Sequence, residues 1–157
     1  VPGRTGMGLS ADTAAALSRH SSVVGLKEAS GNSTLTGEIL EKTRGELPIY
    51  CGNDDLTIPL MVLGFQGVIS VLSNVMPAET SRMTALALEG NWAEAAKMQR
   101  DFLPMVKALF CETSPIPCKA AMSMMGMCRN ELRLPLIPMQ EANQQKLADI
   151  MRGWKLI

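Results

Sequence analysis

The stretch Val23-Val24-Gly25-Leu26-Lys27-Glu28 decides how the rest of the chain is interpreted. Four apolar or small residues lead directly into a lysine, which predicts a strand over residues 23–27, apolar on both faces, with Lys27 at its end. A lysine at the end of a buried strand is either solvated at the rim, where a carboxylate can pair with it, or held in a pocket as an amine nucleophile. The local pattern leaves both interpretations open.

Around this stretch, helices and strands alternate. Apolar periodicity and capping residues predict helices at 11–20, 34–44, 55–63 and 77–89, and strands at 23–27, 48–52 and 67–71. Residues 1–9 are predicted to be a loop, because their prolines and glycines disfavour a regular element. Strict alternation with short connections predicts a parallel sheet with right-handed crossovers. A (β/α)8 TIM barrel fits better than a dinucleotide-binding fold, since no G-x-G-x-x-G motif follows a strand.

The alternation stops after Gly90, and further helices are predicted at 91–111, 117–126 and 140–152. The sequence therefore predicts two domains: residues 1–90 are the C-terminal part of a TIM barrel, with about three parallel strands, and residues 91–157 are a C-terminal three-helix domain. The chain opens on a Pro-Gly turn without a methionine, which suggests the C-terminal part of a longer protein.

Composition excludes several classes of function. Lys plus Arg and Asp plus Glu number 15 each, and this balance disfavours a nucleic-acid or anionic-membrane surface. No apolar run reaches the roughly 18 residues that a transmembrane helix needs. The four cysteines, Cys51, Cys111, Cys118 and Cys128, show no metal-ligand spacing, so we expect no metal site. Scattered single cysteines are typical of buried, reduced thiols in a cytoplasmic protein.

Possible catalytic residues converge at one end of the predicted sheet. In barrel enzymes the site lies at the carboxyl ends of the strands, where the sequence places Lys27, Gly52 and the segment 70–74. The opening loop with Arg4 precedes a helix and is expected on the same side. An amine at this place could form a Schiff base with a ketone, because burial disfavours the ammonium ion and leaves more neutral amine. Arg4 would suit a substrate carboxylate, which its guanidinium can bind through two parallel hydrogen bonds.

At these residues the sequence resembles the dihydrodipicolinate synthase family. The resemblance lies in several motifs in the same order, which together cover almost the whole chain: Val1–Gly6, Gly25–Asn32, Gly52–Asp54, Gly67–Val71 with Asn74 and Pro77, Pro115–Lys119, and Leu132–Pro135. It implies a TIM barrel with a C-terminal helical domain, and condensation of pyruvate with L-aspartate-4-semialdehyde in lysine and diaminopimelate biosynthesis. It also implies a cytoplasmic homotetramer that uses neither a metal nor an organic cofactor.

The resemblance also implies roles for individual residues. Lys27 matches the lysine that forms the Schiff base with pyruvate, and Arg4 matches an arginine that helps to bind the semialdehyde carboxylate. Ile69 matches a residue whose main chain contacts pyruvate, and Gly52 lies beside it in the same pocket. Sister families, the N-acetylneuraminate lyases and keto-deoxy-sugar aldolases, share the lysine, but the loop Gly3–Gly6 favours the synthase.

This sequence is much shorter than the family's chains and begins after the position of the proton-relay tyrosine. It would hold only the last three barrel strands, with inner faces at Val23, Val24, Ile49 and Val68–Val71 open to water. We therefore expect the chain to fold stably only beside the N-terminal half of the barrel. The alternative to an enzyme is an inactive fragment that serves as an association module.

Overall fold

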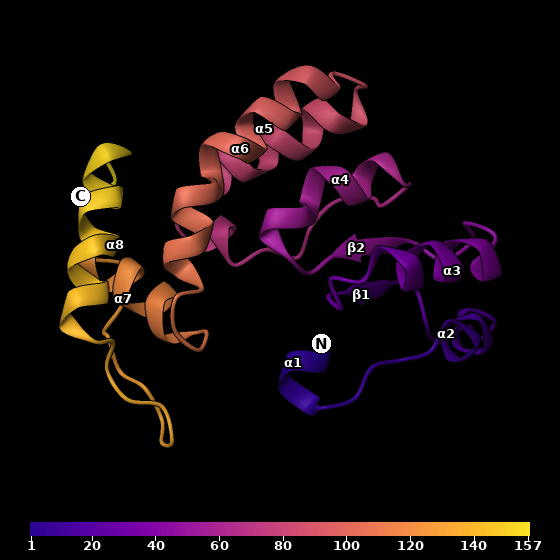
Figure 1. Ribbon diagram of the computed structural model, residues 1–157, viewed down its shortest axis with the longest axis horizontal. Coiled ribbons are helices and arrows are strands. Elements are labelled where there is room, and N and C mark those ends of the chain that lie inside the picture. Colours follow the sequence, from indigo (N-terminus) through magenta and orange to yellow (C-terminus); the bar gives the residue numbers. More distant parts are fainter. The chain divides into compact units, whose positions relative to one another are not determined.

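A computed structural model describes residues 1–157 (Figure 1). The chain forms two compact units, each described here by itself. Unit 1 comprises residues 1–70 and 84–96, and unit 2 comprises residues 71–83 and 97–157. Helices α5 (Pro77–Leu88) and α6 (Trp92–Leu109) each contribute residues to both units. The division into domains at residue 90 stays a prediction. None of the helices combines the length and the apolar character that a membrane span requires.

Unit 1 contains a parallel pair of strands, β1 (Leu26–Glu28) and β2 (Ile49–Cys51), as Figure 1 shows. Lys27 stands opposite Tyr50, and Glu28 opposite Cys51. The parallel pairing confirms the predicted sheet type. Strand β1 is shorter than predicted and ends one residue later, at Glu28. Residues 23–25 were wrongly included, because the N–H of Val23 is used in a turn and donates to the carbonyl oxygen of His20.

The predicted third strand at 67–71 is wrong as a full strand. It is reduced to one parallel bridge between Cys51 and Val68, supported by hydrogen bonds from Cys51 N–H to Gly67 O and from Ile69 N–H to Cys51 O. Pairing ends because Val71 adopts helical backbone angles and leads into the 3-10 helix η2 (Leu72–Asn74). With a neighbour on one side only, few ladder hydrogen bonds hold this segment extended.

The two faces of the small sheet differ in exposure. Ile49 and Cys51 point to the buried face and are 2% and 0% exposed. Lys27 and Tyr50 stand on the opposite face, because successive side chains alternate. Val24, which was predicted to lie on the inner barrel face, precedes β1 and is 81% exposed. Ile49 was wrongly placed on that face; the exposed residue of β2 is Tyr50.

The predicted opening loop contains a short helix, α1 (Pro2–Thr5). Proline fits the first turn of a helix because its missing N–H has no partner there in any case. Gly6 ends the helix with φ 67°, and its N–H donates to the carbonyl oxygen of Pro2. The proline and glycines that predicted a loop therefore delimit one helical turn instead.

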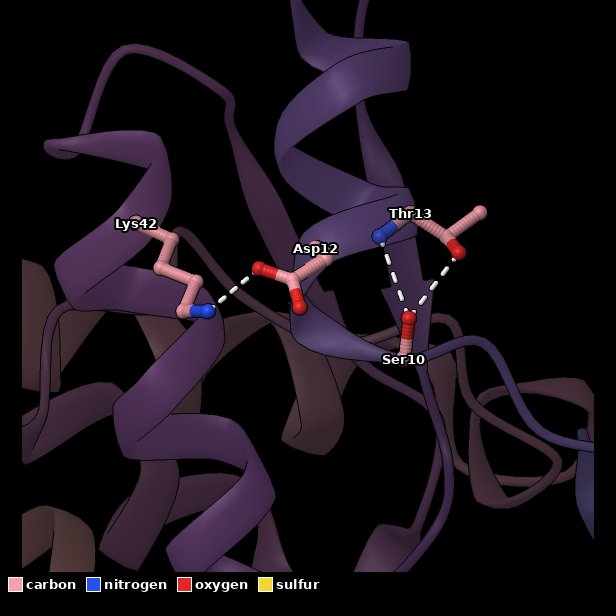
Figure 2. Close-up of polar contacts among 4 residues, drawn as sticks. All are labelled: Ser10, Asp12, Thr13 and Lys42. Atoms are coloured by element: carbon pink, nitrogen blue, oxygen red, sulfur yellow. Dashed lines mark hydrogen bonds and ion pairs between the residues drawn. The ribbon is translucent and has the colours of Figure 1, made fainter.

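Helices α2 (Ala11–Ser18) and α3 (Ser33–Thr43) pack against each other. Ser10 caps α2 as predicted, because its Oγ accepts a hydrogen bond from Thr13 N–H at 3.1 Å (Figure 2). Figure 2 also shows Lys42 of α3 donating to the carboxylate of Asp12 in α2. Both side chains are exposed, so this ion pair adds little stability.

The cap of α3 offers a test of how much local structure stabilises unit 1. The Oδ1 of Asn32 accepts hydrogen bonds from the N–H groups of Thr34 and Leu35, at 3.0 and 3.1 Å. We expect Asn32→Ala to lower the free energy of unfolding by about 1 kcal/mol, because two N-terminal donors lose their partner. Urea unfolding measures this change. An unchanged midpoint would show that water replaces the cap without cost.

The rest of unit 1 closes the buried side of the sheet. The predicted helix at 55–63 is divided into a 3-10 turn, η1 (Asp54–Leu56), and α4 (Thr57–Val62), which contacts β2. Apolar side chains from the segment after η1 complete the core, with Ile58, Leu60, Met61 and Phe65 all buried. The predicted helices of this region are confirmed to within a few residues.

Unit 2 is helical. It contains part of α5 and α6, together with α7 (Ile116–Met124) and α8 (Glu141–Gly153), which pack on each other. The rings of Phe102 and Trp154 lie 5.5 Å apart between centroids. The N-terminus of α8 is held by Glu112, whose Oε1 accepts hydrogen bonds from the Gln140 N–H and the Asn143 side chain. The core includes several buried methionines, among them Met105 and Met151.

Candidate functional site

Lys27 is the middle residue of β1, next to its carboxyl end. Its side chain stands on the open face of the sheet and is exposed, whereas Leu26 is half-buried and Glu28 is buried. The prediction of a buried lysine is therefore wrong for this chain. The physical reason is that the face toward which Lys27 points has no cover here. Lys27 makes no ion pair with a carboxylate. Its exposure agrees with the alternative of a lysine solvated at the rim.

Gly52 lies directly against the Lys27 side chain. A Cβ added at Gly52 would stand 2.7 Å from Lys27 Cε, 2.6 Å from Ala29 Cβ and 3.1 Å from the carbonyl oxygen of Glu28. The first two distances are shorter than carbon atoms tolerate. The N–H of Gly52 donates to that same oxygen at 2.6 Å. The absence of a side chain at residue 52 therefore lets the two strand ends close up and leaves room for the lysine.

Ile69 lies on the segment that neighbours β2, next to the residue that is bridged to Cys51. Its N–H donates to the Cys51 carbonyl oxygen at 2.8 Å, and its side chain is 48% exposed. Lys27, Gly52 and Ile69 therefore come from three neighbouring segments joined by main-chain hydrogen bonds. The contact of the Ile69 main chain with a substrate stays a prediction.

Arg4 lies in α1, and its side chain is exposed. The N-terminal segment reaches the end of β1, because Val1, Pro2, Gly8 and Leu9 line a small cavity together with Lys27, Glu28 and neighbouring residues. The structure thus places the segment that carries Arg4 beside the strand that carries Lys27. Arg4 itself does not line this cavity, and its role as a carboxylate ligand stays a prediction.

The cavity beside Lys27 is too small for a substrate pocket. Its volume is about 50 Å³, far below the roughly 300–1,000 Å³ of ordinary ligand pockets. The site in this chain is one wall, with the amine of Lys27 standing on an open face. Such a wall presents an amine and main-chain groups to solvent. No group of three or more metal-ligating side chains occurs in the structure.

Tyr50 is a neighbour of Lys27 that the sequence analysis did not single out. It is opposite Lys27 in the register, and a Cβ built at Gly25 or Gly67 would contact its ring at 3.7 and 3.8 Å. The signal available in the sequence was the alternation of a strand, which places Tyr50 on the face opposite to Ile49 and Cys51.

The cysteines differ in burial, so the prediction of uniformly buried thiols is wrong. Cys51 and Cys118 are buried, Cys128 is half-buried and Cys111 is exposed, all as free thiols. Burial under the sheet is the main reason that the pKa of the Cys51 thiol is raised from 9.0 to about 11. Its Sγ also donates to the Asn53 carbonyl oxygen at 3.1 Å. Cys51 therefore acts as a packing residue under the strand end.

The Cys51 pKa predicts a pH dependence of stability. The unfolded chain loses the thiol proton near pH 9, while the folded chain keeps it until about pH 11. The free energy of unfolding should therefore decrease through this interval and be unaffected by this group below it. Urea unfolding at pH 8, 10 and 11 should show a steeper decline for the wild type than for Cys51→Ala. Parallel declines would contradict the raised pKa.

Comparisons with known proteins agree with one another. A family model described as the dihydrodipicolinate synthetase family matches residues 1–153. The chain is 45% identical over 157 residues to a 4-hydroxy-tetrahydrodipicolinate synthase of Alkaliphilus oremlandii, covering 100% of this chain and 54% of that protein. The chain thus spans about half the length of the curated relatives it matches.

Solved structures give the same result. Dihydrodipicolinate synthase from Thermotoga maritima superposes with a TM-score of 0.95 at 39% identity, covering 100% of this chain and 55% of that one. The chloride-inhibited enzyme of Acinetobacter baumannii, complexed with pyruvate, superposes with a TM-score of 0.94 at 34% identity, covering 100% and 54%. This fold is therefore similar to about half of each of these proteins.

Proposed function

Because this chain belongs to the dihydrodipicolinate synthetase family, we propose that it is the C-terminal half of a pyruvate-dependent lyase and synthase. The whole protein would condense pyruvate with L-aspartate-4-semialdehyde to form 4-hydroxy-tetrahydrodipicolinate, in lysine and diaminopimelate biosynthesis. The observation that carries the proposal is Lys27 on the open face near the carboxyl end of a parallel strand, where barrel enzymes place their reactive groups. The pyruvate bound to the Acinetobacter relative supports the choice of substrate.

The proposed chemistry begins at the Nζ of Lys27. The neutral amine attacks the ketone carbon of pyruvate, and the adduct takes up a proton and loses water to leave an iminium ion. The iminium withdraws electrons from the pyruvate methyl carbon, so that a proton leaves and an enamine forms. The enamine carbon then forms a bond to the aldehyde carbon of the semialdehyde, whose oxygen takes up a proton, and the lysine becomes an iminium again. The amino group of the semialdehyde attacks the iminium carbon and closes the ring, which releases Lys27 as the free amine. No metal or organic cofactor is required, because the lysine itself provides the electron sink.

Binding of the two substrates is assigned to groups near this amine. Arg4 would bind the semialdehyde carboxylate, since the guanidinium presents two parallel donors. Main-chain groups at Ile69 would contact pyruvate, and Gly52 would leave space for the lysine beside it. The close approach of Gly52 to Lys27 supports this arrangement.

The N-terminal half of the barrel is the proposed partner of this chain. The open face of the sheet presents Tyr50 and Ile69 to solvent, with exposures of 36% and 48%. A barrel closes when further strands cover such a face and pair with the open edges. The same cover would bury Lys27. The partner half could be a separate chain or part of one longer polypeptide, and the assembled protein is expected to be a homotetramer.

Borohydride trapping tests the proposal. The chain, assembled with its N-terminal half, is treated with pyruvate and sodium borohydride, and peptides are sequenced by mass spectrometry. We expect a reduced pyruvyl group on Lys27 and on no other lysine. Absence of this adduct in the assembled protein would overturn the enzymatic proposal and favour an inactive association module.

Turnover distinguishes the synthase from its sister families. We expect condensation of pyruvate with aspartate semialdehyde to be much faster than with N-acetylmannosamine. A preference for the sugar would assign the protein to the neuraminate lyases instead, while leaving the Schiff base on Lys27 intact.

A further inference from the structure

Glu28, the residue after Lys27, has an unusual position for a carboxyl group. Its side chain is on the buried face of β1 and the residue is only 6% exposed. It takes part in no ion pair. Placing a polar side chain under a sheet costs free energy unless its hydrogen bonds are satisfied. A carboxyl group retained there therefore needs specific partners.

Those partners belong to the segment that follows β1. Glu28 Oε1 accepts the main-chain N–H of Ser30 at 2.6 Å, and Oε2 accepts the hydroxyl of Thr36 at 3.4 Å. Thr36 lies in the first half of α3 and is 1% exposed. The carboxyl group thus joins the last residue of the strand to the following turn and to the helix beyond it.

The main chain of Glu28 is fixed as well. Its carbonyl oxygen accepts the Gly52 N–H at 2.6 Å, which ties the end of β1 to the end of β2. Glu28 is therefore held through its side chain to α3 and through its backbone to the neighbouring strand. Because Glu28 is the next residue, the main chain of Lys27 is held in place as well. The Lys27 side chain itself makes no polar contact that would orient it.

We infer that Glu28 is a positioning residue that fixes the direction in which Lys27 presents its amine, an inference that rests on the proposed Schiff-base function. A lysine side chain has four rotatable bonds, so the location of Nζ depends strongly on the orientation of its Cα–Cβ bond. Reaction with a carbonyl requires near-attack geometry, and a displacement of about 1 Å can cost a factor of about 100 in rate. The hydrogen bonds that hold the adjacent Glu28 in place reduce such displacement.

The test separates positioning from folding by measuring two quantities in one experiment. In single-turnover borohydride trapping of the assembled protein with pyruvate, the amplitude counts competent sites and the rate constant reports how fast each one reacts. We expect Glu28→Leu to lower the rate constant at least about 10-fold, because Ser30 and Thr36 lose their acceptor. Glu28→Gln should stay within about 2-fold of wild type, since an amide can accept from Ser30 N–H and donate to the Thr36 hydroxyl.

Thr43→Val is the matched control for lost stability. Thr43 is buried in the same helix, and its hydroxyl donates to the Ile39 carbonyl oxygen at 2.7 Å, away from Glu28. Lost stability in this variant can lower only the amplitude, so the rate constant should be unchanged. If Glu28→Leu behaves in the same way, or if Glu28→Gln is as slow as Glu28→Leu, the positioning inference is overturned.

Amide hydrogen exchange gives a readout that does not depend on pyruvate. We expect Glu28→Leu, but not Thr43→Val, to accelerate exchange at the N–H groups of Ser30 and Gly52, which bond to Glu28 in the wild type. Unchanged exchange at these two groups would show that the Glu28 side chain does not hold this part of the main chain. A wild type that forms no adduct would instead overturn the proposed function. Normal wild-type trapping with an unaffected Glu28→Leu rate constant would overturn the positioning role alone.

Discussion

Replacement of Lys27 by methionine is expected to abolish the pyruvyl adduct and to lower kcat/KM by a factor of about 1,000 or more. Methionine keeps a similar length and an unbranched side chain but cannot form an iminium ion. The substituted side chain lies on the open face of the sheet, so its loss creates no cavity in this chain. Borohydride trapping and steady-state turnover of the assembled protein measure the two effects.

Lys42→Met is the matched control for that experiment. Lys42 is an exposed lysine of the same unit, whose ammonium contacts Asp12 on the neighbouring helix. Its replacement should leave both adduct formation and turnover within about 2-fold of wild type, since exposed ion pairs contribute little. Persistence of the adduct in Lys27→Met would place the nucleophile at another lysine and contradict the assignment of this site.

Gly52→Ala is expected to produce the second largest loss, about 100-fold in kcat. The added methyl carbon would stand 2.6 Å from Ala29 Cβ and 2.7 Å from Lys27 Cε. The alanine carbon is fixed to the backbone, whereas the lysine chain is flexible. Displacement of the Lys27 chain relieves only the second contact. Relief of the first requires a shift of the main chain at residue 29 or 52, and both changes displace the reacting amine. Stopped-flow measurement of adduct formation should show a slower rate constant in a folded protein.

Gly37→Ala provides the comparison for a glycine replacement without crowding. Gly37 is a residue of helix α3, and a Cβ added there meets no atom within 4 Å. Alanine inside a helix should raise stability by about 0.5–1 kcal/mol and leave kcat unchanged. Equal activities of the two alanine variants would show that the space beside Lys27 is not needed for reaction.

Helices could be predicted well because their signals are local. Apolar periodicity, the cap at Ser10 and the glycine after α3 lie within a few residues of the elements that they define. The order of helices and strands, and the parallel pairing of β1 with β2, followed from the same patterns. The opening segment was the exception, since a single turn such as α1 has too few residues to produce a period.

Strand extent and burial could not be predicted in the same way, because both depend on neighbours distant in sequence. Residues 23–25 and 69–71 have strand-like composition, but a strand persists only where a partner supplies hydrogen bonds. The expected third strand is therefore reduced to the bridge at Val68. Lys27 was expected to be buried for a similar reason: its pattern describes a sheet covered on both sides, and this chain covers only one.

The sequence by itself determined the family, the place of Lys27 near a strand end and the candidate residues Arg4, Gly52 and Ile69, since ordered motifs and alternation are properties of the chain. The tertiary structure decided what touches Lys27. It brought Gly52 within contact of the lysine side chain and directed Glu28 beneath the sheet to Ser30 and Thr36. Such contacts depend on register and packing between segments, which no local pattern specifies.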